Sequence, residues 1–232
     1  MSDDVLGTGV LPDGHATVLE RLGELCLLPV VVLEDAADAV PLGRALAGGG
    51  LPVAEVTFRT AAAADAIRAV TDARLSGPDG NELLVGAGTV VTPAQVDAAV
   101  AAGARFVVSP GLSAAVVERC QEHGVLALPG TATATEVQTA LTMGLRTVKF
   151  FPAATSGGPA AVKALSAPFP QMRFVPTGGI TEADVAEYLA LPAVLAAGGS
   201  WMVPAAVVAA GGFDEVRRLT ERAVAATRRP QP

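Results

Sequence analysis

The sequence contains few of the residue types that metal sites and disulfide frameworks require. Only two histidines occur, His15 and His123, and the two cysteines, Cys26 and Cys120, stand far apart without metal-ligand spacing. A metal centre would need a cluster of such side chains, so we expect no metal and no cofactor. Two isolated thiols are typical of a protein from a reducing cytoplasm.

Basic blocks and long unbroken apolar runs are also missing. The net charge is −7, which argues against nucleic acid or an anionic membrane as a partner. Residues 1–4 are acidic where a secretory signal would be basic. The uncharged segment 188–213 is divided by prolines and Gly-Gly pairs into pieces too short to span a bilayer. We therefore expect a cytoplasmic protein without a membrane partner.

Short apolar runs alternate with helical patterns along most of the chain. Strands are predicted at 28–33, 53–57, 83–86, 106–109, 125–128, 147–151, 174–176 and 194–197. Helical segments follow them at 35–47, 61–73, 93–102, 113–123, 135–143, 159–165, 181–189 and 213–226. Continuous apolar strands are typical of a parallel sheet that is covered on both faces.

Eight such units without a change in composition favour an α/β protein with a single (β/α)8 TIM barrel and a short N-terminal helix at 15–25. A doubly wound open sheet is the competing fold, but no Rossmann glycine pattern follows the first strand. We expect a flexible N-terminal segment at 1–14, the barrel at 15–227 and a tail at 228–232. The composition of 76–81 predicts a surface turn.

Lysine is the scarcest charged residue, with Lys149 and Lys163 against fourteen arginines. Arginine cannot supply a neutral amine because its guanidinium stays protonated. Lys149 lies between Val148 and Phe150, and such apolar neighbours disfavour the ammonium form. Lys149 is therefore a candidate nucleophile for covalent chemistry. The alternative is a lysine that ends a strand and extends its ammonium into solvent.

In a barrel, the residues after the strands converge on the face where active sites are built. Glu55 and Arg59 follow or end the second predicted strand, and Lys149 lies near the end of the sixth. Glu55 could relay protons beside Lys149, while Arg59 could bind a substrate carboxylate with its planar guanidinium. The alternative is that Glu55 and Arg59 only pair with each other.

Two glycine pairs follow the last two predicted strands, each beside a hydroxyl: Gly178-Gly179 after Thr177, and Gly198-Gly199 before Ser200. Barrels commonly bind phosphate with these two loops, because glycine amides donate without a side chain in the way. Gly-Gly pairs are also frequent in tight turns. Their presence in both expected places favours a phosphate site.

Several segments resemble signature motifs of the 2-keto-3-deoxy-6-phosphogluconate (KDPG) aldolase and 4-hydroxy-2-oxoglutarate aldolase family. The resemblance runs from about residue 28 to residue 226. The similar segments, in chain order, are G-L-P-V-A-E-V-T-F-R at 50–59, V-G-A-G-T-V at 85–90, S-P-G-L at 109–112, G-L-R-T-V-K-F-F-P-A-A-T-S-G at 144–157, P-T-G-G-I at 176–180 and G-G-S-W at 198–201.

The resemblance implies a class I aldolase that assembles as a homotrimer of barrels. It implies that Lys149 forms a Schiff base with the C2 carbonyl of a 2-oxo acid and that Glu55 is the general acid and base. It places Arg59 and Thr89 at the pyruvate carboxylate. It also implies that Pro110 and Phe151 line the pocket, and that the following residues face the hydroxyl and phosphate end: Thr177, Gly178, Gly179, Gly199 and Ser200.

The favoured reaction is cleavage of KDPG to pyruvate and glyceraldehyde 3-phosphate. Aldolases of 4-hydroxy-2-oxoglutarate or of the galactonate epimer are the alternatives, since the same imine chemistry serves any 2-oxo acid. A metal-dependent aldolase is disfavoured because it would need a cluster of ligands and the sequence contains only two histidines. A barrel that binds a phosphorylated metabolite without turnover is a further possibility, which the presence of both Lys149 and Glu55 disfavours.

Overall fold

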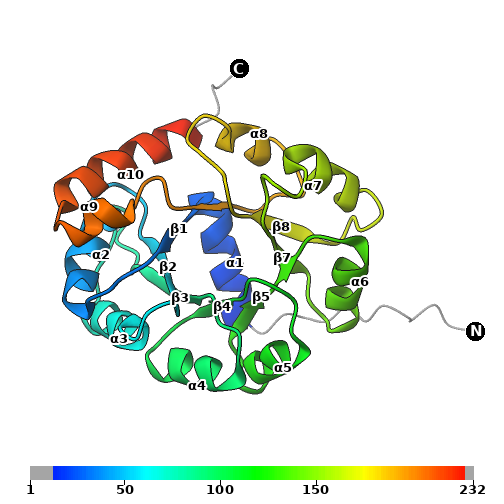
Figure 1. Cartoon of the computed structure of the whole chain (residues 1–232), viewed down its shortest axis with the longest axis horizontal. Coiled ribbons are helices and arrows are strands. Elements are labelled where there is room, and N and C mark those ends of the chain that lie inside the picture. Colours follow the sequence, from blue (N-terminus) through cyan, green and yellow to red (C-terminus); the bar gives the residue numbers. More distant parts are fainter. Residues whose placement is uncertain (1–12, 228–232) are drawn as a thin grey trace, which may run out of the picture.

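The computed structural model describes residues 13–227, and the predictions made for 1–12 and 228–232 lie outside these residues. Figure 1 shows strands gathered at the centre and helices arranged around them. The strands are β1 (Leu27–Val31), β2 (Val53–Thr57), β3 (Leu84–Gly88), β4 (Phe106–Val108), β5 (Leu126–Leu128), β6 (Gly130–Thr131), β7 (Thr147–Phe150), β8 (Arg173–Pro176) and β9 (Ala197–Gly199).

The helices alternate with these strands. They are α1 (Asp13–Leu25), the 3-10 turn η1 (Ala36–Asp38), α2 (Ala39–Gly48), α3 (Ala63–Asp72), α4 (Pro93–Ala101), α5 (Ala114–Glu122), α6 (Ala134–Thr142), α7 (Gly158–Ser166), α8 (Val185–Leu189), α9 (Ala205–Ala209) and α10 (Phe213–Thr227). Helix α1 begins two residues before the predicted start at His15.

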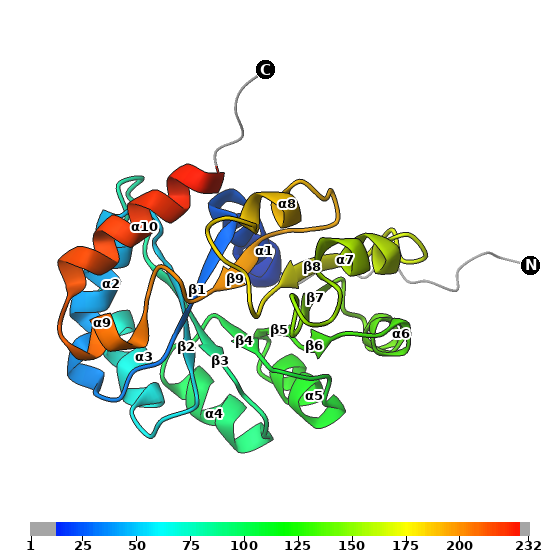
Figure 2. The same cartoon turned by 45° about the horizontal axis from the view of Figure 1, so that its top comes forward.

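The strands form a curled parallel sheet, which confirms the predicted α/β class (Figure 2). By hydrogen bonding it divides into a six-stranded sheet in the order β5-β4-β3-β2-β1-β9 and a three-stranded sheet in the order β6-β7-β8. Isolated parallel bridges also pair Phe174 with Val194 and Thr177 with Gly198. Because the pairing is parallel, the carboxyl ends of all these strands lie at the same end of the sheet.

Strand β6 was not predicted, since the fifth predicted strand ends at residue 128 and the next predicted element is the helix at 135–143. The structure pairs Gly130 with Lys149 and Thr131 with Phe150 in parallel register. Pro129 has no backbone N–H and so cannot continue the ladder as a donor, which separates β5 from β6. Its carbonyl still accepts a hydrogen bond from Lys149 N at 2.9 Å. This pairing fixes the position of Lys149 along β7.

Two predicted elements were misplaced. Strand β9 begins at Ala197, three residues after the predicted start, because Val194 pairs only through its bridge with Phe174. The run Ala-Val-Leu-Ala-Ala is apolar throughout, so its pattern cannot show where pairing begins. Helix α8 begins at Val185 rather than Thr181, because the Asp184 carboxylate accepts a hydrogen bond from Thr181 N at 2.7 Å and holds a turn there.

The hydrophobic core lies between the sheet and the surrounding helices. Phe106, Phe150 and Phe174 are fully buried, as is Leu22 of α1. Helix α1 lies across one end of the strands in Figure 1. Among residues 13–227, no helix is both long enough and apolar enough to cross a membrane.

Candidate active site

The side chains of Lys149 and Glu55 are in contact inside the curled sheet, although Lys149 is on the three-stranded sheet and Glu55 is on the six-stranded sheet. Lys149 is on β7 and Glu55 is on β2. Lys149 Nζ lies 3.5 Å from Glu55 Oε1, and the two residues are 6% and 1% exposed. The alternative of a lysine that extends into solvent is therefore wrong. The pairing of Glu55 with Arg59 is also not observed, because the ion pair of Glu55 is with Lys149.

Two glycines of β3 make room for the side chains around this pair. A Cβ at Gly88 would lie 2.2 Å from Glu55 Oε1, and a Cβ at Gly86 would lie 2.2 Å from the Phe106 ring. Because Gly88 ends β3, its contact with the carboxylate places Glu55 toward the carboxyl end of the sheet. Gly88 was given no role from the sequence. Its place in V-G-A-G-T-V, directly before Thr89, was the available signal.

The environment of the pair is apolar on the lysine side and leaves the carboxylate open for proton exchange. Lys149 Nζ lies 5.0 Å from the centroid of the Phe151 ring. Neither carboxylate oxygen of Glu55 accepts a hydrogen bond from the described residues. A buried carboxylate without hydrogen bonds is costly to keep, and Lys149 is the cation beside it. A proton that leaves the amine therefore has an acceptor in contact, and a bound substrate can supply further partners.

Arg59 and Thr89 lie together at the ends of neighbouring strands. Arg59 Nε donates a hydrogen bond to Thr89 Oγ1 at 3.4 Å. Arg59 is exposed, whereas Thr89 is half-buried. Thr89 has a φ of 56°, in the left-handed region that few non-glycine residues adopt. The structure thus places a guanidinium and a hydroxyl side by side, and both groups can donate hydrogen bonds to an anion.

Pro110 and Phe151 follow β4 and β7. A Cβ at Gly130 would lie 2.1 Å from the Pro110 carbonyl oxygen, so β6 can approach Pro110 only because residue 130 is a glycine. Phe151 N donates to Thr131 O at 3.1 Å. These contacts hold the segments after β4, β6 and β7 against one another.

The two glycine-rich loops are also brought together. The bridge between Thr177 and Gly198 joins the ends of β8 and β9, and a Cβ at Gly198 would lie 2.3 Å from Thr177 Oγ1. Gly178 and Gly179 have φ values of 100° and 77°, which a side chain would strain. Gly199 is buried under the Trp201 ring, and Ser200 is exposed.

No group of three or more histidine, cysteine, aspartate or glutamate side chains in the described part of the chain could hold a metal ion.

Comparison with known protein families gives one match over most of the chain. The family described as "Aldolase: KDPG and KHG aldolase" matches residues 18–219. A "2-dehydro-3-deoxy-phosphogluconate aldolase" from Treponema pallidum is 51% identical over 206 residues, covering 89% of this chain and 95% of the relative. A "KHG/KDPG aldolase" from Escherichia coli K12 is 43% identical over 198 residues, covering 85% and 90%.

Solved structures show the same likeness. A KDPG aldolase from Legionella pneumophila, with pyruvate captured as a covalent carbinolamine, superposes with a TM-score of 0.81 at 40% identity. The superposition covers 88% of this chain and 96% of that one. The Zymomonas mobilis aldolase with 3-phosphoglycerate gives a TM-score of 0.80 at 41% identity, with coverage of 93% and 97%.

Proposed function

Because the chain belongs to the KDPG and KHG aldolase family, we propose that Lys149 is its Schiff-base lysine and Glu55 its proton carrier. The chain is an aldehyde-lyase, and its reaction is cleavage of KDPG to pyruvate and glyceraldehyde 3-phosphate. The observation that supports these two residues most is the buried 3.5 Å contact between Lys149 Nζ and Glu55 Oε1. The pyruvate carbinolamine in the Legionella pneumophila structure is the matching chemistry in a relative.

Imine formation begins when the neutral amine of Lys149 attacks the C2 carbonyl of the 2-oxo acid. The carbinolamine then loses water, and the nitrogen remains bonded to C2 as a protonated imine. Glu55 accepts the proton that the amine gives up and returns one to the departing hydroxyl.

Carbon–carbon cleavage follows from the positive charge on the imine nitrogen. The C4 hydroxyl loses its proton as C4 becomes the aldehyde carbon, and the electrons of the C3–C4 bond move to the imine to form an enamine. Protonation of C3 restores the imine, and hydrolysis releases pyruvate and the free amine. Glu55 is the carboxyl group that exchanges these protons, because it is in contact with the nitrogen to which C2 is attached.

Substrate binding is assigned to the groups around the pair. Arg59 and Thr89 bind the pyruvate carboxylate, supported by their mutual hydrogen bond. Pro110 and Phe151 line the apolar part. Thr177, Gly178, Gly179, Gly199 and Ser200 bind the hydroxyl and phosphate end, supported by the bridge that joins the two loops.

The six-stranded and three-stranded sheets are joined by isolated bridges, as a barrel would require. We therefore also propose that the strands close into a full (β/α)8 barrel. A homotrimer is expected from the family resemblance, and a cytoplasmic location from the composition; both stay predictions.

The test of the function is reduction by borohydride in the presence of pyruvate. An imine at Lys149 would become a stable secondary amine, and mass spectrometry of the digested chain would find the pyruvate-derived mass on the peptide that carries Lys149. The matched control is Lys149→Arg, which keeps the positive charge but cannot form an imine. We expect this variant to fold, to remain unlabelled and to lose turnover. Label on another residue, or activity in Lys149→Arg, would show that the assignment is wrong.

The alternative substrate, 4-hydroxy-2-oxoglutarate, is suggested by relatives whose names include both activities. It has no phosphate, so the two glycine-rich loops would contribute little to its binding. Comparing kcat/KM for KDPG, its galactonate epimer and 4-hydroxy-2-oxoglutarate separates these substrates directly.

A further inference from the structure

The last residue of the G-G-S-W segment has no role in the candidate active site. Trp201 is the only tryptophan of the chain. It lies two residues after the end of β9, in a turn that is closed by a hydrogen bond from Val203 N to Ser200 O at 3.0 Å. Trp201 therefore lies directly beside the loop that we propose to bind phosphate.

The ring of Trp201 lies against the backbone of Gly199. A Cβ at Gly199 would be 1.9 Å from Cζ3 of the ring and 2.2 Å from Cε3, and real Cβ atoms essentially never come within 3.0 Å of a neighbour. A side chain at residue 199 would therefore have to displace the ring. Because Gly199 is itself buried, the ring packs tightly on this end of β9.

Thr177 packs on the same strand end from the other side. A Cβ at Gly198 would lie 2.3 Å from Thr177 Oγ1. Because successive Cβ positions of a strand point to opposite faces, Thr177 and Trp201 lie against opposite faces of β9 at Gly198 and Gly199. The Gly-Gly pair is thereby enclosed between two side chains, although glycine has the largest backbone freedom of all residues.

Two backbone amides beside this enclosed pair have no acceptor. Neither Ser200 N nor Gly179 N donates a hydrogen bond to another group within residues 13–227. Gly178 O accepts a hydrogen bond from Ala154 N at 3.0 Å. Since the C=O and N–H of a trans peptide group point in opposite directions, the N–H of Gly179 points away from Ala154. Such amides can donate to phosphate oxygens without a side chain in the way.

The indole packs through its ring surface and not through its N–H. Trp201 Nε1 is buried and donates to no acceptor among the described residues. The ring atoms that contact Gly199 belong to the six-membered half of the indole, on the side away from Nε1. A buried tryptophan N–H usually has a partner, so here the packing of the ring alone fixes its position.

We propose that Trp201 is a positioning residue for the phosphate end of the substrate. Its ring keeps Gly199 and Ser200 in one conformation, so that the amide of Ser200 is already oriented when the phosphate binds. This role rests on the proposed function of the glycine-rich loops, through which Trp201 acts without touching the substrate. Without the ring, phosphate binding would also have to order the loop, which weakens binding.

The test is the kinetics of Trp201→Ala and Trp201→Phe, each checked for folding by circular dichroism. We expect Trp201→Ala to raise KM for KDPG about tenfold and to change kcat by no more than about twofold, because ordering one glycine on binding costs about that factor in affinity. The half-saturating pyruvate concentration for methyl-proton exchange should stay within about twofold of the parent's, since pyruvate has no phosphate. Trp201→Phe should keep KM within about threefold of the parent's, because it retains an aromatic ring and removes only a donor without an acceptor.

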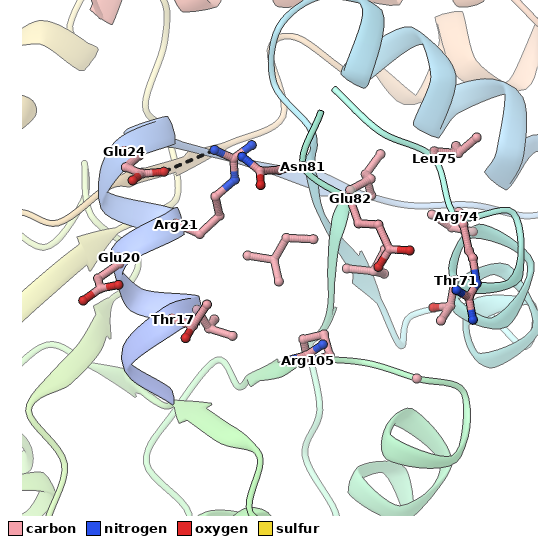
Figure 3. A pocket seen from close by; sticks show the side chains of 16 residues that line it. Thr17, Glu20, Arg21, Glu24, Thr71, Arg74, Leu75, Asn81, Glu82 and Arg105 are labelled. Atoms are coloured by element: carbon pink, nitrogen blue, oxygen red, sulfur yellow. Dashed lines mark hydrogen bonds and ion pairs between the residues drawn. The ribbon is translucent and has the colours of Figure 1, made fainter. Parts of the chain in front are cut away.

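The matched control is Leu75→Ala at the opposite end of the sheet. A pocket of about 390 Å³ lies there, lined by Leu75 and by charged residues such as Arg74 and Arg105 (Figure 3). Arg105 directly precedes β4, so this charged pocket lies at the amino ends of the strands. Leu75 is half-buried like Trp201 and also packs against a glycine, since a Cβ at Gly43 would lie 2.8 Å from its Cδ1. We expect Leu75→Ala to have the parent's KM for KDPG.

The outcomes separate the role of Trp201 from the proposed function. If the parent chain does not trap pyruvate at Lys149 or does not cleave KDPG, the proposed function is wrong and the role of Trp201 is lost with it. If the parent does both, the role of Trp201 alone is wrong under any of three results: Trp201→Ala has the parent's KM, Trp201→Phe is as impaired as Trp201→Ala, or Leu75→Ala raises KM equally. An equal loss of pyruvate exchange in Trp201→Ala would assign Trp201 to the stability of the fold and also overturn the proposal.

Discussion

Glu55 has an environment that few surface carboxylates share. It is almost fully buried, it contacts Lys149 Nζ at 3.5 Å, and it accepts no hydrogen bond from the described residues. Gly88 gives it the space it occupies. A carboxylate that only stabilised the fold would be expected to have satisfied oxygens. The unsatisfied oxygens suit a group whose partners are the substrate and its protons.

Glu55→Gln separates imine formation from proton transfer, because the amide has the same shape but cannot carry the proton. We expect the variant to be trapped with pyruvate by borohydride, while exchange of the pyruvate methyl protons for deuterium slows by about a hundredfold or more. Proton NMR in D2O measures this exchange. Glu34→Gln, which changes an exposed glutamate after β1, should exchange normally. If Glu55→Gln also exchanged normally, the proton carrier would be another group.

At the scale of single elements, two helices, α4 and α6, have starts that are stabilised by local side-chain hydrogen bonds. A reciprocal capping box formed by Thr92 and Gln95 stabilises the start of α4, and one formed by Thr133 and Glu136 stabilises the start of α6. In α6 the Glu136 carboxylate accepts hydrogen bonds from Ala132 N at 2.8 Å and Thr133 N at 2.9 Å. These bonds anchor the segment that connects β6 to α6.

Glu136→Ala tests this cap through its pH dependence. The hydrogen bond from Ala132 N is the main reason that the pKa of Glu136 lies below its ordinary value of 4.5. A carboxyl with a lowered folded-state pKa stabilises the fold above its unfolded pKa, and this stabilisation is lost as the pH falls through the folded pKa.

The variant should therefore lose about 1 kcal/mol of unfolding free energy at pH 7, and the difference from the parent should shrink as the pH falls below about 4.5. Urea unfolding at a series of pH values measures it. Glu118→Ala removes an exposed glutamate of α5 and should show neither effect. A loss at pH 7 that stayed constant into acid would assign the stabilisation to packing instead.

For the whole molecule, the two ends of the sheet carry different sets of residues. The carboxyl ends carry Lys149, Glu55, Arg59 and the glycine-rich loops, while α1 and the charged pocket lie at the amino ends. Between them, fully buried side chains such as Phe106 and Phe150 fill the space next to the strands. The pair that we propose to be catalytic, Lys149 and Glu55, therefore lies on strands above a packed interior.

Phe106→Ala measures how much this interior contributes. Phe106 is fully buried over Gly86, and truncating such a ring should lower the unfolding free energy by about 3–5 kcal/mol. Val91→Ala is the comparison, since Val91 is 52% exposed and its loss should change stability by no more than about 0.5 kcal/mol. Urea or thermal unfolding compares the two. Similar losses for both would mean that Phe106 is not part of a tightly packed core.

Local pattern was sufficient for most elements of the fold. Strand β2 occupies the predicted residues 53–57, and α4 begins at the predicted Pro93. The two strands that were missed or displaced, β6 and β9, lie where the pattern carries no end signal. Gly130-Thr131 is too short to be periodic, and the uniformly apolar run before β9 is equally compatible with several strand starts.

The sequence by itself determined the candidate residues and their chemistry, because a lysine among apolar neighbours, an acid at a strand end and two Gly-Gly loops can be recognised without coordinates. It left open whether Glu55 contacts Lys149 or Arg59. Only the tertiary structure showed that the partner is Lys149, because β2 and β7 belong to different hydrogen-bonded sheets and nearly a hundred residues separate them along the chain. The contact between the two side chains exists because the sheet curls, and curling is a property of the packed strands together rather than of any local segment.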